Sequence, residues 1–186
     1  MAQSSTSLRG MVFAALMAAF TAAGAYIVIP IGPVPIVLQN LFVLLAGLLL
    51  GSRGALTSMT VYLLAGACGL PVFAGGTGGI GRLVGPTGGY LIGFAVAAFV
   101  IGWIAETGKG GVLLDVFALV CGTLIIYVLG VYWLKLATAM SWNKALAAGM
   151  LPFLPGDTVK IAVAVPIVRI LRPIVSGKTV PVQVVG

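Results

Sequence analysis

The stretch VLLDVFALVCGTLIIYVLGVYW, residues Val112–Trp133, decides the fold of this chain. Asp115 is its only charged side chain. A helix needs about 20 consecutive, mainly apolar residues to cross the hydrocarbon core of a bilayer. The stretch is both long enough and apolar enough, and it therefore predicts a membrane-spanning helix.

The rest of the chain has the same character. Of its 186 residues, 61% are apolar and 7% are charged, and the mean hydropathy is +1.22. A soluble globule of this size cannot bury so much apolar surface. Six spans would occupy roughly 120 residues and leave the remainder for tails and turns. We therefore expect an all-α integral membrane protein, a single membrane domain over residues 1–186, with six transmembrane helices at 11–30, 36–50, 55–68, 89–104, 112–133 and 151–171.

Turns of different kinds separate these spans. Residues 31–35, Ile-Gly-Pro-Val-Pro, form a stiff break because proline cannot continue a helix. Residues 51–54, Gly-Ser-Arg-Gly, predict a tight polar turn. The third span, 55–68, is short, so we expect it to be tilted or partly re-entrant. Residues 69–86 form a loop unlike the rest, which contains the run GGTGGIGR at 75–82.

The first span also resembles a secretory signal. Arg9 precedes the apolar run, and Ala23-Gly24-Ala25 imitates a cleavage site. The apolar run continues through Ile31, however, and further spans follow it. These features favour a helix that is retained.

Basic residues indicate the orientation of the spans, because cytoplasmic loops carry an excess of Lys and Arg. With six spans and the amino terminus inside, three basic residues, Arg82, Lys135 and Lys144, lie outside. The opposite orientation would reverse the bias. We therefore predict that both termini are cytoplasmic and that loop 69–86 is external. The basic residues on the cytoplasmic side are then Arg9, Arg53, Lys109, Arg169, Arg172 and Lys178.

The polar residues exclude several classes of function. The net charge of +7 comes from basic residues scattered singly between apolar runs, which fits orientation signals and not a nucleic-acid-binding surface. The sequence has no His and only three acidic residues, so it can hardly assemble an acid–base pair, and we do not expect an enzyme. Cys68 and Cys121 stand apart and are interpreted as packing thiols, without a metal site or a cofactor.

Two short motifs imitate nucleotide-binding loops. Residues 76–81 match the pattern G-x-G-x-x-G, but no soluble strand precedes them and no acidic residue follows about 20 positions later. Gly177-Lys178-Thr179 ends like a phosphate-binding loop, but Arg172 occupies the position of the required upstream glycine. We therefore expect neither nucleotide binding nor an ATPase in this chain.

Asp157 and Lys160 are the strongest candidates for a functional site. A spacing of three places both side chains on one face of the last span. Ionisable groups at membrane depth are costly enough to suggest a function. Together the two residues offer an acceptor and a donor to a polar ligand. The alternative is an ion pair that only joins this helix to its neighbours.

Further candidates for ligand contact lie near the same outer level. Gln39 and Asn40 either cap and cross-link helices or line a polar pocket. Arg82 is the cation nearest to an anionic ligand, or else a solvated loop residue. Gly78 and Gly79 let backbone N–H groups approach a ligand closely, because no Cβ intervenes, or they belong to a flexible linker.

Small residues recur at every fourth position on two adjacent ridges of the first span. In lipid, such ridges let helix backbones approach each other. Internal packing accounts for one ridge and leaves the other for a second subunit, although the sequence does not say which one faces outward. The two ridges are Ala14, Ala18 and Ala22, and Ala15, Ala19 and Ala23.

Two neighbouring stretches resemble those of a known family. Residues 70–76, LPVFAGG, lead into residues 85–94, GPTGGYLIGF. Together they resemble the signature of the BioY family, the biotin-binding S components of energy-coupling factor transporters. The resemblance extends to VPIVLQ at 34–39, LLAGLLLG at 44–51 and PGDTVK at 155–160, and so covers nearly the full chain.

The resemblance implies an S-component-like bundle in the bacterial plasma membrane that captures biotin from outside with high affinity. It also implies uptake energised by a separate module, made of a transmembrane coupling subunit and two cytoplasmic ATPases. In similar S components an alanine-rich face of the first helix contacts the coupling subunit. We expect loop 69–86 to close over biotin before the loaded protein reorients and releases it inward.

The ligand's chemistry suits the residues identified above. Biotin's ureido ring offers two N–H donors and one carbonyl acceptor, which Asp157 and Lys160 complement. Arg82, Asn40 or loop N–H groups would hold the carboxylate, and Tyr90 would pack on the ring or seal the site. Three alternatives stay open: an S component for another vitamin, an unassisted small-solute facilitator or exporter, and a structural subunit without a ligand.

Overall fold

The structure, a computed structural model, describes residues 2–29, 33–108 and 111–176. It is mostly helical, with one short antiparallel hairpin that pairs Val28 with Val37 and Ile29 with Ile36. In chain order the elements are α1 (Ala2–Gly24), β1 (Val28–Ile29), β2 (Ile36–Val37), α2 (Gln39–Ala67), α3 (Ile80–Val84), α4 (Gly88–Thr107), α5 (Val112–Thr138), α6 (Trp142–Gly149) and α7 (Leu154–Ser176).

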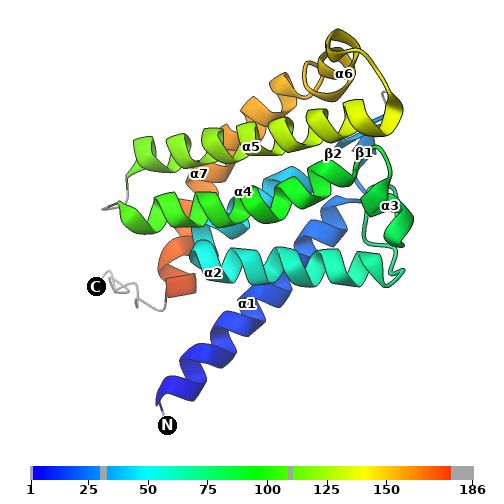
Figure 1. Cartoon of the computed structure of the whole chain (residues 1–186). Helices are drawn as coiled ribbons and strands as arrows, with labels where there is room; N and C mark the ends of the chain where they lie inside the picture. Colours follow the sequence, from blue (N-terminus) through cyan, green and yellow to red (C-terminus); the bar gives the residue numbers. More distant parts are fainter. Residues whose placement is uncertain (1, 30–32, 109–110, 177–186) are drawn as a thin grey trace.

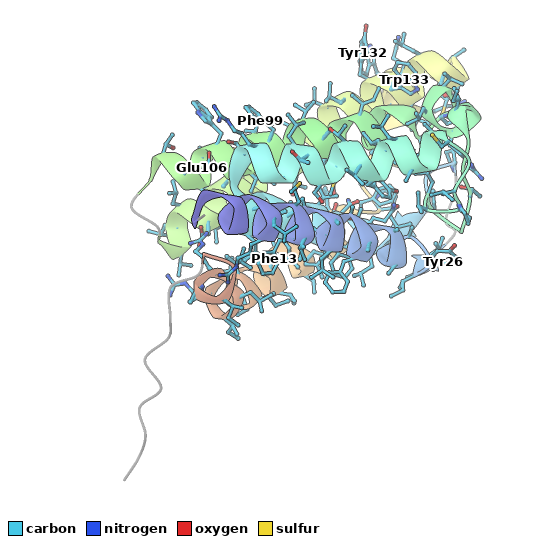
Figure 2. All side chains as sticks on the ribbon, turned by 90° about the horizontal axis from the view of Figure 1, so that it is seen from below. Phe13, Tyr26, Phe99, Glu106, Tyr132 and Trp133 are labelled. Carbon is cyan, nitrogen blue, oxygen red and sulfur yellow. The ribbon has the colours of Figure 1, made fainter. Side chains whose placement is uncertain are left out.

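The long helices form one bundle with two distinct ends. The β1–β2 hairpin, α3 and α6 lie at one end, which we call the loop end (Figure 1). The start of α1 and the end of α7 lie at the other, which we call the terminal end (Figure 1). In Figure 2, Glu106 lies at the terminal end, whereas Tyr26, Tyr132 and Trp133 lie at the loop end.

The described basic residues lie toward both ends of the bundle, and Lys160, near the start of α7, lies at the loop end. Arg9, Arg53, Arg169 and Arg172 belong to the parts of α1, α2 and α7 near the terminal end, whereas Arg82, Lys135 and Lys144 belong to α3, α5 and α6. Lys109, Lys178 and the tail beyond Ser176 lie outside the described residues.

A sharp bend inside α2 replaces the predicted four-residue turn at 51–54. Only Gly51 leaves the helical conformation, with φ 72° and ψ 179°, which glycine adopts without strain. The Glu106 carboxylate then caps the helix that restarts at Ser52: the Ser52 N–H donates to Oε1 at 2.9 Å, and the Ser52 hydroxyl donates to Oε2 at 2.7 Å. An acceptor here satisfies free backbone donors of the new helix end, and its negative charge suits that end of the helix dipole. One residue is therefore enough to separate the second and third predicted spans.

Three of the helices within the described ranges are long and apolar enough to cross a membrane. They are α2, α4 and α5. The apolar part of α1, Leu8–Gly24, is shorter, and α7 carries four charged residues, Asp157, Lys160, Arg169 and Arg172. Because α2 bends at Gly51, it contains two of the predicted spans. The count of six spans stays a prediction.

Helix α4 packs at the centre of the bundle, against both α2 and α5. Its Ile101 side chain is fully buried and lies against Gly47 of α2 and Gly122 of α5, where a Cβ would overlap it. Gly102, the next residue, brings the α4 backbone against the backbone of Gly51 and Ser52. Small residues at helix contacts are the means by which helices approach closely in lipid.

The close approach at Gly102 gives a stability prediction. A Cβ at residue 102 would overlap the backbone nitrogen of Ser52, and neither backbone can move without disturbing the Gly51 bend. We expect Gly102→Ala to lower the free energy of unfolding by about 1–3 kcal/mol, the usual cost of overpacking. Thermal unfolding of the purified protein in detergent measures the effect.

A matched control is available in α1, where a Cβ on Gly10 would meet nothing within 4 Å. Gly10→Ala should leave the melting temperature unchanged or raise it, since alanine favours helix by up to about 1 kcal/mol. Equal melting temperatures for Gly102→Ala and the unmodified chain would show that α4 and the bend are not closely packed.

Candidate functional site

A cavity at the loop end collects most of the residues that the sequence singled out. Its walls come from the segment before α2, from the start of α2, from loop 69–86 and from α4, α5 and α7. Five aromatic rings line it: Phe73, Tyr90, Phe94, Tyr127 and Phe153. The side chains with hydrogen-bonding groups at its surface, besides the two tyrosines, are Gln39, Asn40, Thr77, Arg82, Thr87 and Lys160. An apolar pocket with few polar groups is typical of a small-molecule site.

Lys160 is the most constrained of these polar side chains. Its Nζ donates to Asp157 Oδ1 at 2.8 Å and to the Val37 carbonyl oxygen at 2.9 Å. An ammonium group has three N–H donors, so one remains for the cavity that Lys160 lines. Because Lys160 is 9% exposed and Asp157 is 3% exposed, the pair forms a buried salt bridge.

The start of α7 places this pair. Asp157 lies in the first turn of the helix, where its carboxylate suits the positive end of the helix dipole, and its N–H donates to the Phe153 carbonyl at 2.8 Å. Lys160 follows one turn later on the same face. Its bond to Val37 joins α7 to strand β2, so the hairpin fixes the position of the ammonium group.

Asp157 itself stands behind the cavity wall and does not line the cavity. Its second carboxylate oxygen, Oδ2, accepts a hydrogen bond from the Tyr127 hydroxyl of α5. Both oxygens of Asp157 therefore have partners, and both partners, Lys160 and Tyr127, line the cavity.

Both predicted amides line the cavity as well. Gln39, the first residue of α2, is 1% exposed, and its Nε2 donates to the Tyr62 hydroxyl. Its amide therefore also joins two parts of α2, so the two roles considered from the sequence are combined in one side chain. Asn40 is half-buried at the cavity wall.

Loop 69–86 is anchored beside the cavity by Phe73. The Phe73 ring packs edge-on against Tyr62, with the ring centres 5.6 Å apart, and lies against Gly66. Gly75 and Gly76 turn the chain with φ 73° and 70°, which brings Thr77 back to pair with Phe73. The Gly75 N–H donates to the Ala25 carbonyl at 2.9 Å, so the loop is also held against the end of α1.

The structure does not bring Gly78 and Gly79 to this cavity. Gly78 lies against the Leu70 carbonyl and lines a neighbouring cavity, whereas the Gly79 N–H donates to the Gly66 carbonyl at 2.7 Å. Arg82, exposed on α3, lines both cavities. Their role as ligand contacts stays a prediction.

Tyr90 forms part of the wall and is held firmly. Its hydroxyl donates to the Gly149 carbonyl at 2.7 Å, and its ring lies against Gly130 of α5. Nearby, Trp133 Nε1 donates to the Gly85 carbonyl at 2.9 Å, which fixes the end of the loop before α4. These two contacts join the loop end of α4 to α5 and α6.

The three acidic residues have different partners, and Asp157 lies at the opposite end of the bundle from Glu106 and Asp115 (Figure 1). Glu106 caps the bend in α2 at the terminal end. Asp115, 1% exposed in the first turn of α5, accepts a hydrogen bond at 2.7 Å from Arg172. Asp157 belongs to the cavity at the loop end. Among the described residues, no group of His, Cys, Asp or Glu is placed to hold a metal ion.

The structure distinguishes the two alanine ridges of α1. Ala14 and Ala18 are 3% and 6% exposed, and Ala22 is half-buried, so this ridge packs inside the bundle. The second ridge, Ala15, Ala19 and Ala23, is exposed. Exposed Leu16 and Phe20 flank it, so an apolar face of small residues points away from the bundle.

The chain is similar to known proteins in sequence and in structure. A sequence profile of the BioY family matches residues 1–177. The chain is 46% identical to a probable biotin transporter BioY of Pyrococcus horikoshii over 85% of its length and 93% of that protein. It is 43% identical to the biotin transporter BioY of Thermotoga maritima, over 84% and 92% of the two chains. The crystal structure of the S component for biotin from an ECF-type ABC transporter superposes with a TM-score of 0.83 and 32% identity, covering 89% of this chain and 92% of that one.

Proposed function

The chain belongs to the BioY family, and from this premise we propose that it is a biotin-binding membrane subunit that mediates biotin uptake. One observation carries the proposal for this chain's own residues. Lys160, fixed by Asp157 and Val37, presents a spare N–H donor inside a cavity whose walls are otherwise mainly aromatic and aliphatic. The family is one of transporters, so no catalytic residues are assigned.

The cavity's chemistry suits the parts of biotin. The spare donor of Lys160 complements the urea carbonyl, and the rings of Phe73, Tyr90 and Phe94 suit the apolar bicyclic body and alkyl chain. Arg82 and Asn40, which also line the cavity, are the proposed donors for the carboxylate. A buried donor discriminates strongly against occupants that offer it no acceptor, because such an occupant leaves the donor unpaired.

The proposed topology has six spans in the bacterial plasma membrane, with both termini in the cytoplasm. The shared end of α1 and α7 supports it (Figure 1). So does the distribution of basic residues outside the spans: four described arginines lie toward that end and three cations, Arg82, Lys135 and Lys144, toward the loop end, with Lys160 assigned to the interior of a span. The cavity then opens toward the outside, and loop 69–86 closes over the bound vitamin.

Energy for uptake is proposed to come from a separate module, a transmembrane coupling subunit with two ATPases. The exposed ridge of Ala15, Ala19 and Ala23 is the proposed contact, since small residues allow a partner helix to pack closely in lipid. The loaded protein then reorients against this module and releases biotin inward.

Binding by the purified chain is the first test of the proposal. Calorimetry with biotin should give a saturable isotherm, and other vitamins at the same concentration should give no heat of binding. Saturable binding of a different vitamin would assign another substrate. A flat isotherm for every vitamin would favour a structural subunit.

Transport is tested separately, in vesicles. Vesicles that hold this chain together with a coupling subunit and ATPases should accumulate biotin in the presence of ATP, and vesicles that hold the chain alone should not move it. Movement of biotin down its gradient through the chain alone would instead identify a facilitator.

A further inference from the structure

Tyr127 lines the cavity, although nothing in the sequence marked it as a ligand contact. It lies in the middle of α5, 4% exposed, within the apolar stretch that defines the span. Its hydroxyl donates to Asp157 Oδ2. The side chain thus forms a second arm of the network around Asp157, opposite Lys160.

Each carboxylate oxygen of Asp157 accepts one hydrogen bond from one of these two arms. Oδ1 accepts from Lys160 at 2.8 Å, Oδ2 accepts from Tyr127, and the carboxylate does not line the cavity. A ligand therefore meets the ammonium of Lys160 and the phenol of Tyr127 before it meets the carboxylate. Asp157 orients both groups.

The bond to Asp157 determines what Tyr127 can offer a ligand. A phenol has one O–H donor, and here that donor is hydrogen-bonded to the carboxylate. The phenol oxygen can therefore only accept a hydrogen bond from a ligand. Donation to an ionised acceptor also increases the negative charge on the phenol oxygen, which makes it a better acceptor. At this wall the cavity presents an ammonium donor beside an acceptor-only phenol.

We propose that the Tyr127 phenol oxygen accepts a hydrogen bond from one N–H of the cyclic urea, and that Asp157 is a positioning residue behind Tyr127 and Lys160. This inference rests on the proposed function. It identifies Tyr127 as the group that accepts a hydrogen bond from the ligand. Tyr127 would then select ligands that carry an N–H next to the carbonyl bound by Lys160. A ligand ring with an acceptor atom in place of this N–H would bind more weakly, because two acceptors would face each other with no hydrogen bond between them.

The test compares biotin with two lactam analogues, in each of which a CH₂ group replaces one of the two urea N–H groups. Tyr127→Phe should weaken biotin binding by about 10- to 30-fold, as expected for the loss of a buried hydrogen bond. It should weaken one lactam by the same factor and leave the other, which lacks the N–H bonded to Tyr127, nearly unchanged. Equal weakening of all three ligands, or of none, would overturn the inference.

A control variant and an isosteric replacement protect the result from a folding defect. Tyr132→Phe removes a hydroxyl that points away from the helices, where Tyr132 is 53% exposed, and should leave biotin affinity unchanged (Figure 2). Incorporation of 3-fluorotyrosine at position 127 keeps the bond to Asp157 but makes the phenol oxygen a weaker acceptor. Biotin affinity should fall about two- to fivefold with the melting temperature maintained, because less charge on the oxygen weakens the bond. Unchanged affinity would mean that Tyr127 only supports Asp157.

The role of Asp157 is tested by combining substitutions. If Asp157 acts only through its two partners, then Asp157→Asn should weaken binding much less in a background that carries both Tyr127→Phe and Lys160→Met than in the unmodified chain. A full, additive effect of Asp157→Asn would instead place the carboxylate in direct contact with the ligand. Failure of the unmodified chain to bind biotin would refute the proposed function, an outcome distinct from normal biotin binding that is insensitive to Tyr127.

Discussion

Lys160→Ala is expected to weaken biotin binding by about 1–3 kcal/mol, the loss expected when a buried polar group is left without its partner. The dissociation constant should rise by roughly 5- to 150-fold. The substitution removes the donor to the urea carbonyl. It also breaks the bonds at 2.8 Å to Asp157 and at 2.9 Å to Val37 that join α7 to the hairpin. Calorimetry on purified protein measures the change.

Two further variants separate loss of the ligand contact from loss of charge or of folding. Lys144→Ala removes the same charge from exposed α6 at the same end of the bundle and should leave affinity unchanged. Lys160→Met keeps most of the side-chain volume while removing the donor, and should weaken binding as much as Lys160→Ala does. If Lys160→Ala and Asp157→Asn both bind biotin with normal affinity, the pair only joins helices.

The second large effect is expected in transport and not in binding. Ala19→Trp places a large ring in the middle of the exposed ridge of α1, so a partner helix can no longer pack closely against it. We expect ATP-driven biotin uptake in reconstituted vesicles to fall by at least about tenfold, equivalent to 1.4 kcal/mol of lost contact. Biotin affinity of the isolated subunit should be unchanged, because Ala19 is exposed and does not line the cavity.

The matched control is Ala137→Trp, which enlarges an exposed alanine on α5 instead. It should retain uptake. Normal uptake by Ala19→Trp would exclude this ridge as the contact with the coupling subunit, and a loss of uptake in both variants would indicate a general defect in insertion or folding.

Hydropathy predicted the long helices well because few backbone conformations are stable in lipid. A backbone in hydrocarbon must satisfy its own hydrogen bonds, so each apolar run becomes helical. Helices α4 and α5, Gly88–Thr107 and Val112–Thr138, cover the stretches predicted for the fourth and fifth spans. The short elements have no comparable signal. Strands β1 and β2 have two residues each, and α6 lies in a stretch predicted only as a connection.

The bend in α2 illustrates where local sequence stops being informative. Residues 51–54 look like a turn because glycine, serine and arginine interrupt an apolar run. The chain turns at Gly51 alone because Glu106, a residue 54 positions later than Ser52, caps the following helix. No local pattern contains that contact.

In the candidate site, too, some residues could be predicted from the local sequence and others could not. Asp157 and Lys160 could be identified because charges within an apolar span are costly and a spacing of three places them on one face. Tyr127 and Phe73 could not, since each looks like an ordinary apolar residue of its segment and reaches the cavity only through the packing of α5 and of loop 69–86. The orientation of the alanine ridges was also undecided, because small or apolar residues occur on all sides of α1 and periodicity alone could not select a face.

A structure of the protein with bound biotin tests the central claim most directly. It should show the bicyclic ring in the cavity between loop 69–86 and α7, with the urea carbonyl oxygen within hydrogen-bond distance of Lys160 Nζ. Biotin bound elsewhere, with the Lys160 ammonium still confined to Asp157 and the Val37 carbonyl, would contradict it.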